Sequence, residues 1–147
     1  MAEGETTLEF PVRIPVVGKY LSQIGAMLAL LTLPVSIVAF HSGDSLVGLT
    51  YALIAAALAA AAWGGRFLPE AKPIQSNEAM VVVALTFVLT PVLMAIPMTI
   101  GGLAPDDALF EAVSAITTTG LSTLASVEGA SSAFVFERAW QIGRAHV

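Results

Sequence analysis

Three long stretches of this chain carry no charged residue, and they constrain its fold more than any other feature. They are residues 21–40, 45–65 and 79–105. A helix needs roughly 20 residues to cross about 30 Å of hydrocarbon, and each stretch is long enough to do so. The sequence therefore predicts an all-α membrane protein, with transmembrane helices at about 19–41, 46–64 and 78–99.

The remaining composition excludes several classes of function. Only 12% of the residues are charged, whereas soluble domains carry about 25%. The chain has no cysteine, which excludes a disulfide framework, a thiolate metal site and a thiol nucleophile. The net charge of −5 is spread over termini and loops, so there is no basic face for nucleic acid. No arrangement typical of a hydrolase, a phosphate-binding loop or a metalloprotease is present, and we expect neither an enzyme nor a cofactor.

Positive residues indicate how the helices cross the membrane. Four of the six precede the first span or lie between the second and third spans: Arg13, Lys19, Arg66 and Lys72, and none follows the third span until Arg138. Lys and Arg concentrate in cytoplasmic loops. The pattern predicts a cytoplasmic N-terminus, with residues 66–77 inside and residues 41–45 and 105–133 outside.

The segment after the third span is too polar and too short to cross a bilayer. Pro105 suits the first position of a helix, and Asp106 and Asp107 suit its positive N-terminal end. A short helix should follow to Ile116, where three β-branched threonines and Gly120 disfavour its continuation. Two interpretations remain open: a re-entrant pore helix with a selectivity-filter loop, or a surface loop in which Thr-Thr-Thr-Gly is only a turn.

The pore-loop interpretation has a clear energetic basis. Moving a bare cation into a medium of low dielectric constant costs tens of kcal/mol, and a ring of backbone carbonyls offsets this cost by replacing the hydration shell. The candidate carbonyls belong to Thr117, Thr118, Thr119, Gly120 and Leu121. One such segment supplies about a quarter of a ring.

Acidic residues cluster on the same segment. Asp106, Asp107 and Glu111 would raise the cation concentration at an outer mouth. The alternative is a solvated acidic loop that happens to follow a membrane helix.

The stretch Asp107-Ala-Leu-Phe-Glu-Ala-Val-Ser-Ala-Ile-Thr-Thr-Thr-Gly120 resembles the first pore helix and filter of the Trk/Ktr/HKT superfamily of potassium transporters, above all the bacterial Trk membrane subunit. Residues 19–64 resemble its two leading helices, Asn77-Glu78-Ala79 the start of the first repeat, and residues 134–141 the approach to the next helix. The resemblance implies a multi-pass protein of the bacterial inner membrane that takes up K⁺ through four repeats. It also implies a homodimer in membrane lipid, with a cytoplasmic nucleotide-binding regulatory subunit.

The expected organisation follows from these assignments. It comprises a cytoplasmic tail (1–18), two leading helices (19–64), a cytoplasmic loop (65–77), an incomplete first repeat (78–141) and an unrelated end (142–147). The last six residues, Ile-Gly-Arg-Ala-His-Val, are also what ATCGGAAGAGCACACGTC encodes. That DNA is part of a common short-read sequencing adapter, so we expect the natural sequence to depart from this one after Gln141, leaving a fragment not competent alone.

Two other functions fit the same pattern. A small channel of four identical copies would place one pore loop from each copy around the ion. A membrane anchor or assembly subunit would transport nothing. Substitution of Gly120 separates a filter from an anchor: lost K⁺ uptake with normal membrane insertion supports a filter, and unchanged uptake supports an anchor.

Overall fold

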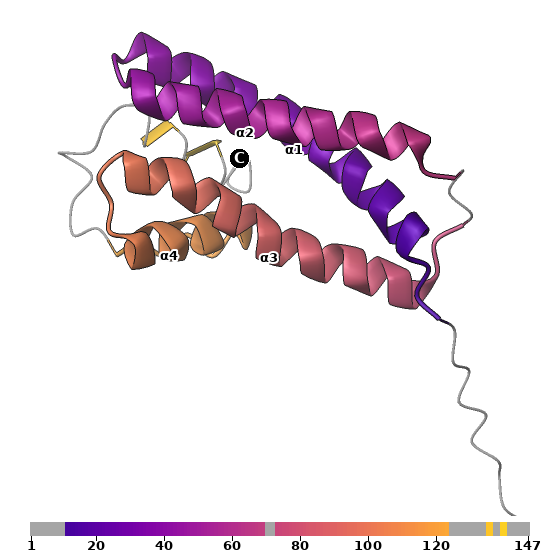
Figure 1. Cartoon of the computed structure of the whole chain (residues 1–147). Coiled ribbons are helices and arrows are strands. Elements are labelled where there is room, and N and C mark those ends of the chain that lie inside the picture. Colours follow the sequence, from indigo (N-terminus) through magenta and orange to yellow (C-terminus); the bar gives the residue numbers. More distant parts are fainter. Residues whose placement is uncertain (1–10, 70–72, 124–134, 137–138, 141–147) are drawn as a thin grey trace, which may run out of the picture.

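The computed structural model describes residues 11–69, 73–123, 135–136 and 139–140. Its elements are α1 (Ile14–His41), α2 (Ser45–Gly64), a short 3-10 helix η1 (Gly65–Phe67), α3 (Ser76–Ile100) and α4 (Pro105–Ile116), shown in Figure 1. Three helical segments are long and apolar enough to cross a membrane: α1, α2 with η1, and α3. The described residues therefore have the fold of an all-α membrane protein, as predicted.

The first helix begins five residues before the expected position, at Ile14 rather than residue 19. Arg13 has extended backbone angles and Pro15 lies in the first turn, where a proline needs no hydrogen-bond partner. Lys19 misleads as a boundary marker, since its long side chain leaves the helix and its ammonium donates to the Gly65 carbonyl at 3.0 Å. A lysine near a helix end can extend in this way while its backbone stays helical.

Helices α1 and α2 form an antiparallel hairpin that small residues hold together. Gly43 makes the turn with a φ of 90°. The Ser36 hydroxyl then donates to the Gly48 carbonyl of α2 at 2.8 Å. A β-carbon at Gly48 would lie 3.0 Å from the ring of Phe40, so glycine permits this close approach. Small residues serve helix packing well in lipid, where apolar burial drives little association.

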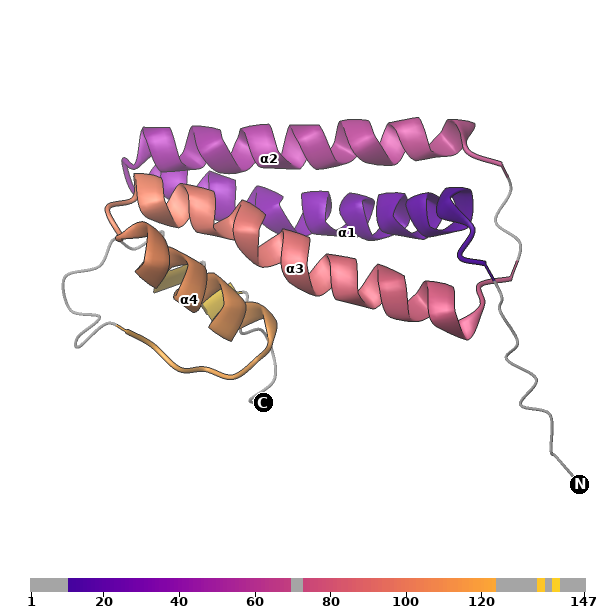
Figure 2. The same ribbon diagram turned by 60° about the horizontal axis from the view of Figure 1, so that its bottom comes forward.

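Helix α4 folds back alongside α3 after a tight turn, and Figure 2 shows the two side by side. Helix α3 continues through Pro91 and Pro97, both buried. The turn uses Gly102, which has a φ of 107°, and the Leu103 N–H donates to the Met98 carbonyl at 3.2 Å. This short connection holds the start of α4 beside the end of α3.

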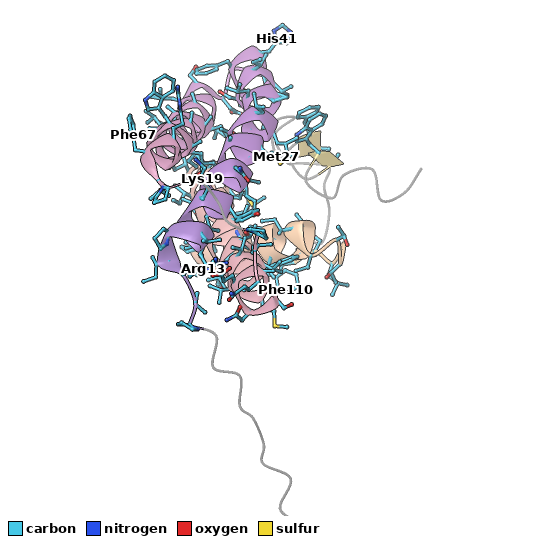
Figure 3. The ribbon with its side chains drawn as sticks, turned by 90° about the vertical axis from the view of Figure 1, so that its right-hand side faces the viewer. Arg13, Lys19, Met27, His41, Phe67 and Phe110 are labelled. Atoms are coloured by element: carbon cyan, nitrogen blue, oxygen red, sulfur yellow. The ribbon has the colours of Figure 1, made fainter. Side chains whose placement is uncertain are left out.

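The hydrophobic core lies at the end of the bundle that includes α4. Every long helix contributes to it: Val35, Tyr51, Ile54, Met94, Ala95, Met98, Ala108 and Ala112. The outer surface is also apolar, with Met27 67% and Phe67 82% exposed; Figure 3 shows Phe67 pointing away from the helices. Exposed apolar side chains all along the spans suit contact with lipid.

Candidate functional site

The segment after α3 forms a short helix and then reverses direction. Helix α4 has 12 residues, which gives it a length of about 18 Å, well short of the roughly 30 Å of a bilayer core. The chain then turns back along its own helix. The Ser114 hydroxyl donates to the Leu121 carbonyl at 2.7 Å, and the Thr123 N–H donates to the Glu111 carboxylate at 2.8 Å. The returning chain therefore runs towards the end of α4 at which it entered (Figure 2).

Helix α4 ends where the three threonines predict, and its end is closed by two nested hydrogen bonds. The Thr118 N–H donates to Ala115 O at 3.1 Å and the Thr119 N–H to Ser114 O at 2.9 Å, which is the Schellman arrangement. This arrangement needs a left-handed residue, usually glycine, and here Thr118 takes that position with a φ of 56°. A β-branched residue with such a φ is strained.

Beyond this closure the main-chain oxygens are free. In the part of the chain that the structure describes, no group donates a hydrogen bond to the carbonyls of Thr117, Thr118, Thr119 or Gly120. All four residues are exposed. The Leu121 carbonyl, also a candidate, differs because it accepts the Ser114 hydroxyl. Four consecutive unpaired carbonyls, two of them on residues with positive φ, form a short stretch that can coordinate a cation.

The three carboxylates expected at an outer mouth lie in different surroundings. Asp106 is exposed and Asp107 half-buried in the first turn of α4, where they favour the positive end of the helix dipole. Glu111 is only 1% exposed. Its carboxylate accepts the Ser122 hydroxyl at 2.5 Å as well as the Thr123 N–H. Glu111 therefore holds the returning chain, whereas Asp106 faces outward.

The binding of the returning chain by Glu111 was not predicted from the sequence, although the helical periodicity of α4 places Glu111 on the packed face. Positions 108, 111, 112 and 115 lie on one face of a helix, and in the structure all four are buried. The large apolar side chains of Leu109, Phe110 and Val113 are on the other side and are 41–42% exposed. A glutamate among alanines on the packed face needs polar partners, and the hydroxyl-rich segment after Gly120 supplies them.

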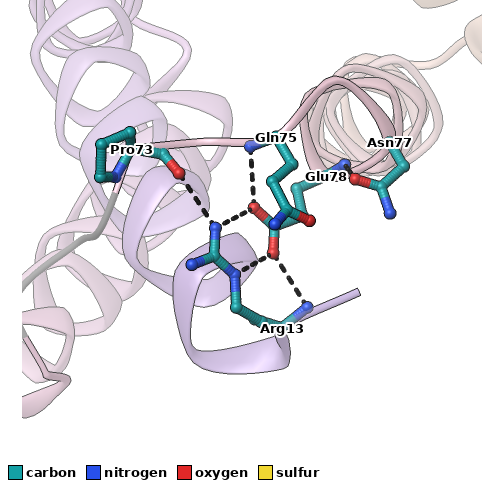
Figure 4. A network of polar contacts seen from close by, with 5 residues as sticks. All are labelled: Arg13, Pro73, Gln75, Asn77 and Glu78. Atoms are coloured by element: carbon teal, nitrogen blue, oxygen red, sulfur yellow. Dashed lines mark hydrogen bonds and ion pairs between the residues drawn. The ribbon is translucent and has the colours of Figure 1, made fainter. Parts of the chain in front are cut away.

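A second polar cluster lies at the other end of α3 and was not predicted. The Arg13 guanidinium donates to the two carboxylate oxygens of Glu78 at 2.7 and 2.8 Å, and the Arg13 and Gln75 N–H groups add bonds of 3.0 Å each. Arg13 also reaches the Pro73 carbonyl at 2.9 Å, as Figure 4 shows. The Glu78 carboxylate raises the pKa of Arg13 chiefly through their hydrogen bond. The cluster joins the starts of α1 and α3.

No protein-family model and no curated protein matches this chain. The class of this protein is therefore defined by its fold and its site and not by similarity to a known protein. The chain is a helical membrane protein with three candidate spans and a short fourth helix, after which the chain turns back on itself.

Proposed function

We propose that this chain contributes part of the ion path of a Trk-type potassium uptake protein, with the carbonyls of residues 117–120 acting as ligands for K⁺. The observation that carries the proposal is a run of four carbonyls, on exposed residues, without hydrogen-bond partners among the described residues. They follow a helix too short to span the bilayer and precede a chain that turns back. Irregular backbone is tolerated at membrane depth where it is buried in protein or lines water.

The proposed orientation places the N-terminus in the cytoplasm and the loop on the outer side of a bacterial cell membrane. Arg13, Lys19 and Arg66 lie at the end of the bundle where α1 and α3 begin and α2 ends. Asp44 and Asp106 lie at the opposite end, near the turn between α1 and α2 and the start of α4. This separation of charge follows the positive-inside rule, and it puts the negative residues where cations enter.

The ring around the ion needs more than one segment. Four carbonyls from a single loop reach a cation from one side only, whereas a filter surrounds it. In our proposal the other sides come from further repeats of the same protein, which functions as a homodimer with a cytoplasmic nucleotide-binding regulator. Four copies of a short channel would satisfy the same geometry, and the mass of the assembly in detergent separates the two arrangements.

A matched pair of glycine substitutions tests the proposal. Gly120 and Gly43 have φ of 72° and 90°, and a β-carbon at either would meet no atom within 4 Å. Alanine therefore causes similar backbone strain at both positions, about 1–2 kcal/mol, without a clash. In the full-length protein, expressed in bacteria that lack their own potassium uptake, we expect Gly120→Ala to lower Rb⁺ uptake about tenfold, the factor that corresponds to 1.4 kcal/mol.

Gly43→Ala should retain uptake, because its turn lies outside the site. Equal Rb⁺ uptake by the two variants, at equal amounts in the membrane, would contradict the filter and favour a membrane anchor or assembly subunit.

A further inference from the structure

Two side chains of α4 bind the returning chain just beyond the free carbonyls. Ser114 donates its hydroxyl to Leu121 O at 2.7 Å. One turn earlier on the helix, Glu111 Oε1 accepts the Ser122 hydroxyl at 2.5 Å and the Thr123 N–H at 2.8 Å. Both side chains are at least nine-tenths buried, at 1% exposed for Glu111 and 6% for Ser114. The chain after the loop is thus attached to α4 over three consecutive residues.

These contacts complete a second support for the loop. Its first support is the closed end of α4, where the N–H groups of Thr118 and Thr119 bond back to the helix. Its second support comprises the bond from Ser114 to Leu121 and the bonds from Ser122 and Thr123 to Glu111. The carbonyls of Thr117 and Thr118 lie within the first support, and those of Thr119 and Gly120 lie between the two supports. Because both supports belong to α4, the positions of the carbonyls depend on the hydrogen bonds of that one helix.

The second support is strong because a buried carboxylate is stable only when hydrogen bonds replace its contacts with water. An ionised group removed from water must be matched by hydrogen bonds, and bonds to a charged group are shorter and stronger than neutral ones. Glu111 finds its bonds in the segment that follows Gly120. Any displacement of residues 122–123 would leave this charge without those donors, so the charge resists displacement of the loop.

We propose that Glu111 and Ser114 are positioning residues that set the spacing of the loop carbonyls and thereby the discrimination between alkali cations. The inference rests on the proposed function of the loop. Selectivity in a carbonyl filter depends on cavity size and on the number and field of the coordinating oxygens. Neither Glu111 nor Ser114 needs to touch the ion to influence these properties, since each acts through the backbone of residues 121–123.

The test measures discrimination as well as rate. In the full-length protein, Rb⁺ uptake is followed with and without excess Na⁺ for the variants Glu111→Gln, Ser114→Ala and Ser122→Ala. We expect each variant to lose discrimination, seen as stronger inhibition by Na⁺ and a higher KM for Rb⁺ at equal amounts in the membrane. The loss should be greatest, about tenfold, for Glu111→Gln, because bonds to a charged acceptor exceed neutral ones.

Asp44→Asn is the matched control for Glu111→Gln. It also converts a carboxylate to an amide at the same end of the bundle, and no hydrogen bond from the Asp44 side chain is seen among the described residues. Because a charge near the entrance attracts Rb⁺ and Na⁺ alike, its loss should leave the Rb⁺ to Na⁺ preference unchanged whatever it does to the KM for Rb⁺. Ser122→Ala covers the possibility that a substitution of buried Glu111 prevents folding, because Ser122 is exposed and its alanine variant keeps α4 intact.

The outcomes separate the inference from the proposed function. If Gly120→Ala lowers uptake but Glu111→Gln, Ser114→Ala and Ser122→Ala all keep the original preference, the positioning role is wrong and the filter stands. If Gly120→Ala has no effect on uptake, the filter itself fails. If Glu111→Gln does not reach the membrane, unchanged preference in both Ser114→Ala and Ser122→Ala overturns the inference, and altered preference in either supports it.

Discussion

Thr118 and Gly120 both adopt left-handed backbone angles, but at different cost. Gly120 reaches a φ of 72° without a β-carbon to obstruct it, whereas Thr118 does so at 56° as a β-branched residue. Such strain persists only where the surroundings enforce it, and here the N–H groups of Thr118 and Thr119 are both held by the end of α4. The strained residue lies among the carbonyls without partners, and the proposed filter would give a reason to retain it.

At the opposite end of α3, Arg13 and Glu78 act as one unit, and a double-mutant cycle should show this. Glu78 is 0% exposed, so Arg13→Ala leaves its carboxylate without its main partner and should lower the melting temperature in detergent by several degrees. Glu78→Gln should lower it less. The double variant should lose less than the two single losses combined, since each removes the same interaction; strict additivity would show that the pair is not coupled.

Features that depend on neighbouring residues could be predicted from the sequence, whereas features that depend on long-range contacts could not. Gly120 stood out because a glycine after three threonines changes the backbone locally, and the end of α4 at Ile116 followed from the same stretch. The pairing of Arg13 with Glu78 joins residues 65 apart in the chain, and no local pattern contains that information. The strain at Thr118 was also missed, because its φ is set by hydrogen bonds that only the folded chain shows.

At the scale of the helices, α2 has one glycine that packs against α1, Gly48, and one, Gly64, that faces open space among the described residues. A β-carbon at Gly48 would lie 3.0 Å from the Phe40 ring, while one at Gly64 would meet nothing within 4 Å. Gly48→Leu should therefore push α1 and α2 apart and destabilise the protein by about 1–3 kcal/mol. Gly64→Leu should change stability by less than about 0.5 kcal/mol. Reversible unfolding in mild detergent measures both, and equal effects would contradict the packing described for the hairpin.

The long helices were largely predictable because lipid imposes a simple rule. Apolar stretches without charge must become helices so that their backbone groups are paired, and the spans at α2 and α3 begin and end within two residues of the expected positions. The start of α1 is an exception, because the charged Lys19 suggests a boundary in the sequence but lies inside the helix, which begins at Ile14. The hydrogen bonds from Ser114 to Leu121 and from Thr123 to Glu111 show that the chain turns back after α4, and no local pattern in the sequence contains these contacts.

On the scale of the whole molecule, the fold places two polar regions at opposite ends of an apolar bundle. Arg13 and Glu78 join α1 and α3 at one end, and the α4 loop packs near the other, close to the core that all long helices share. Much of the outer surface is apolar, Phe67 included. In the proposed function, this bundle is the scaffold that carries the short loop into the membrane, and the rest of the ring approaches the loop from its exposed side.

The most direct test of this account is the reaction rate of a single thiol at position 119 with a small, positively charged, membrane-impermeant reagent. The chain has no cysteine, so Thr119→Cys reports from one site, and Ser42→Cys in the exposed turn after α1 serves as the reference. In the full-length protein in intact cells we predict that both react from outside, that Thr119→Cys reacts more slowly, and that K⁺ slows only Thr119→Cys. Reaction at position 119 as fast as at position 42, and unaffected by K⁺, would show a freely solvated loop and contradict the account.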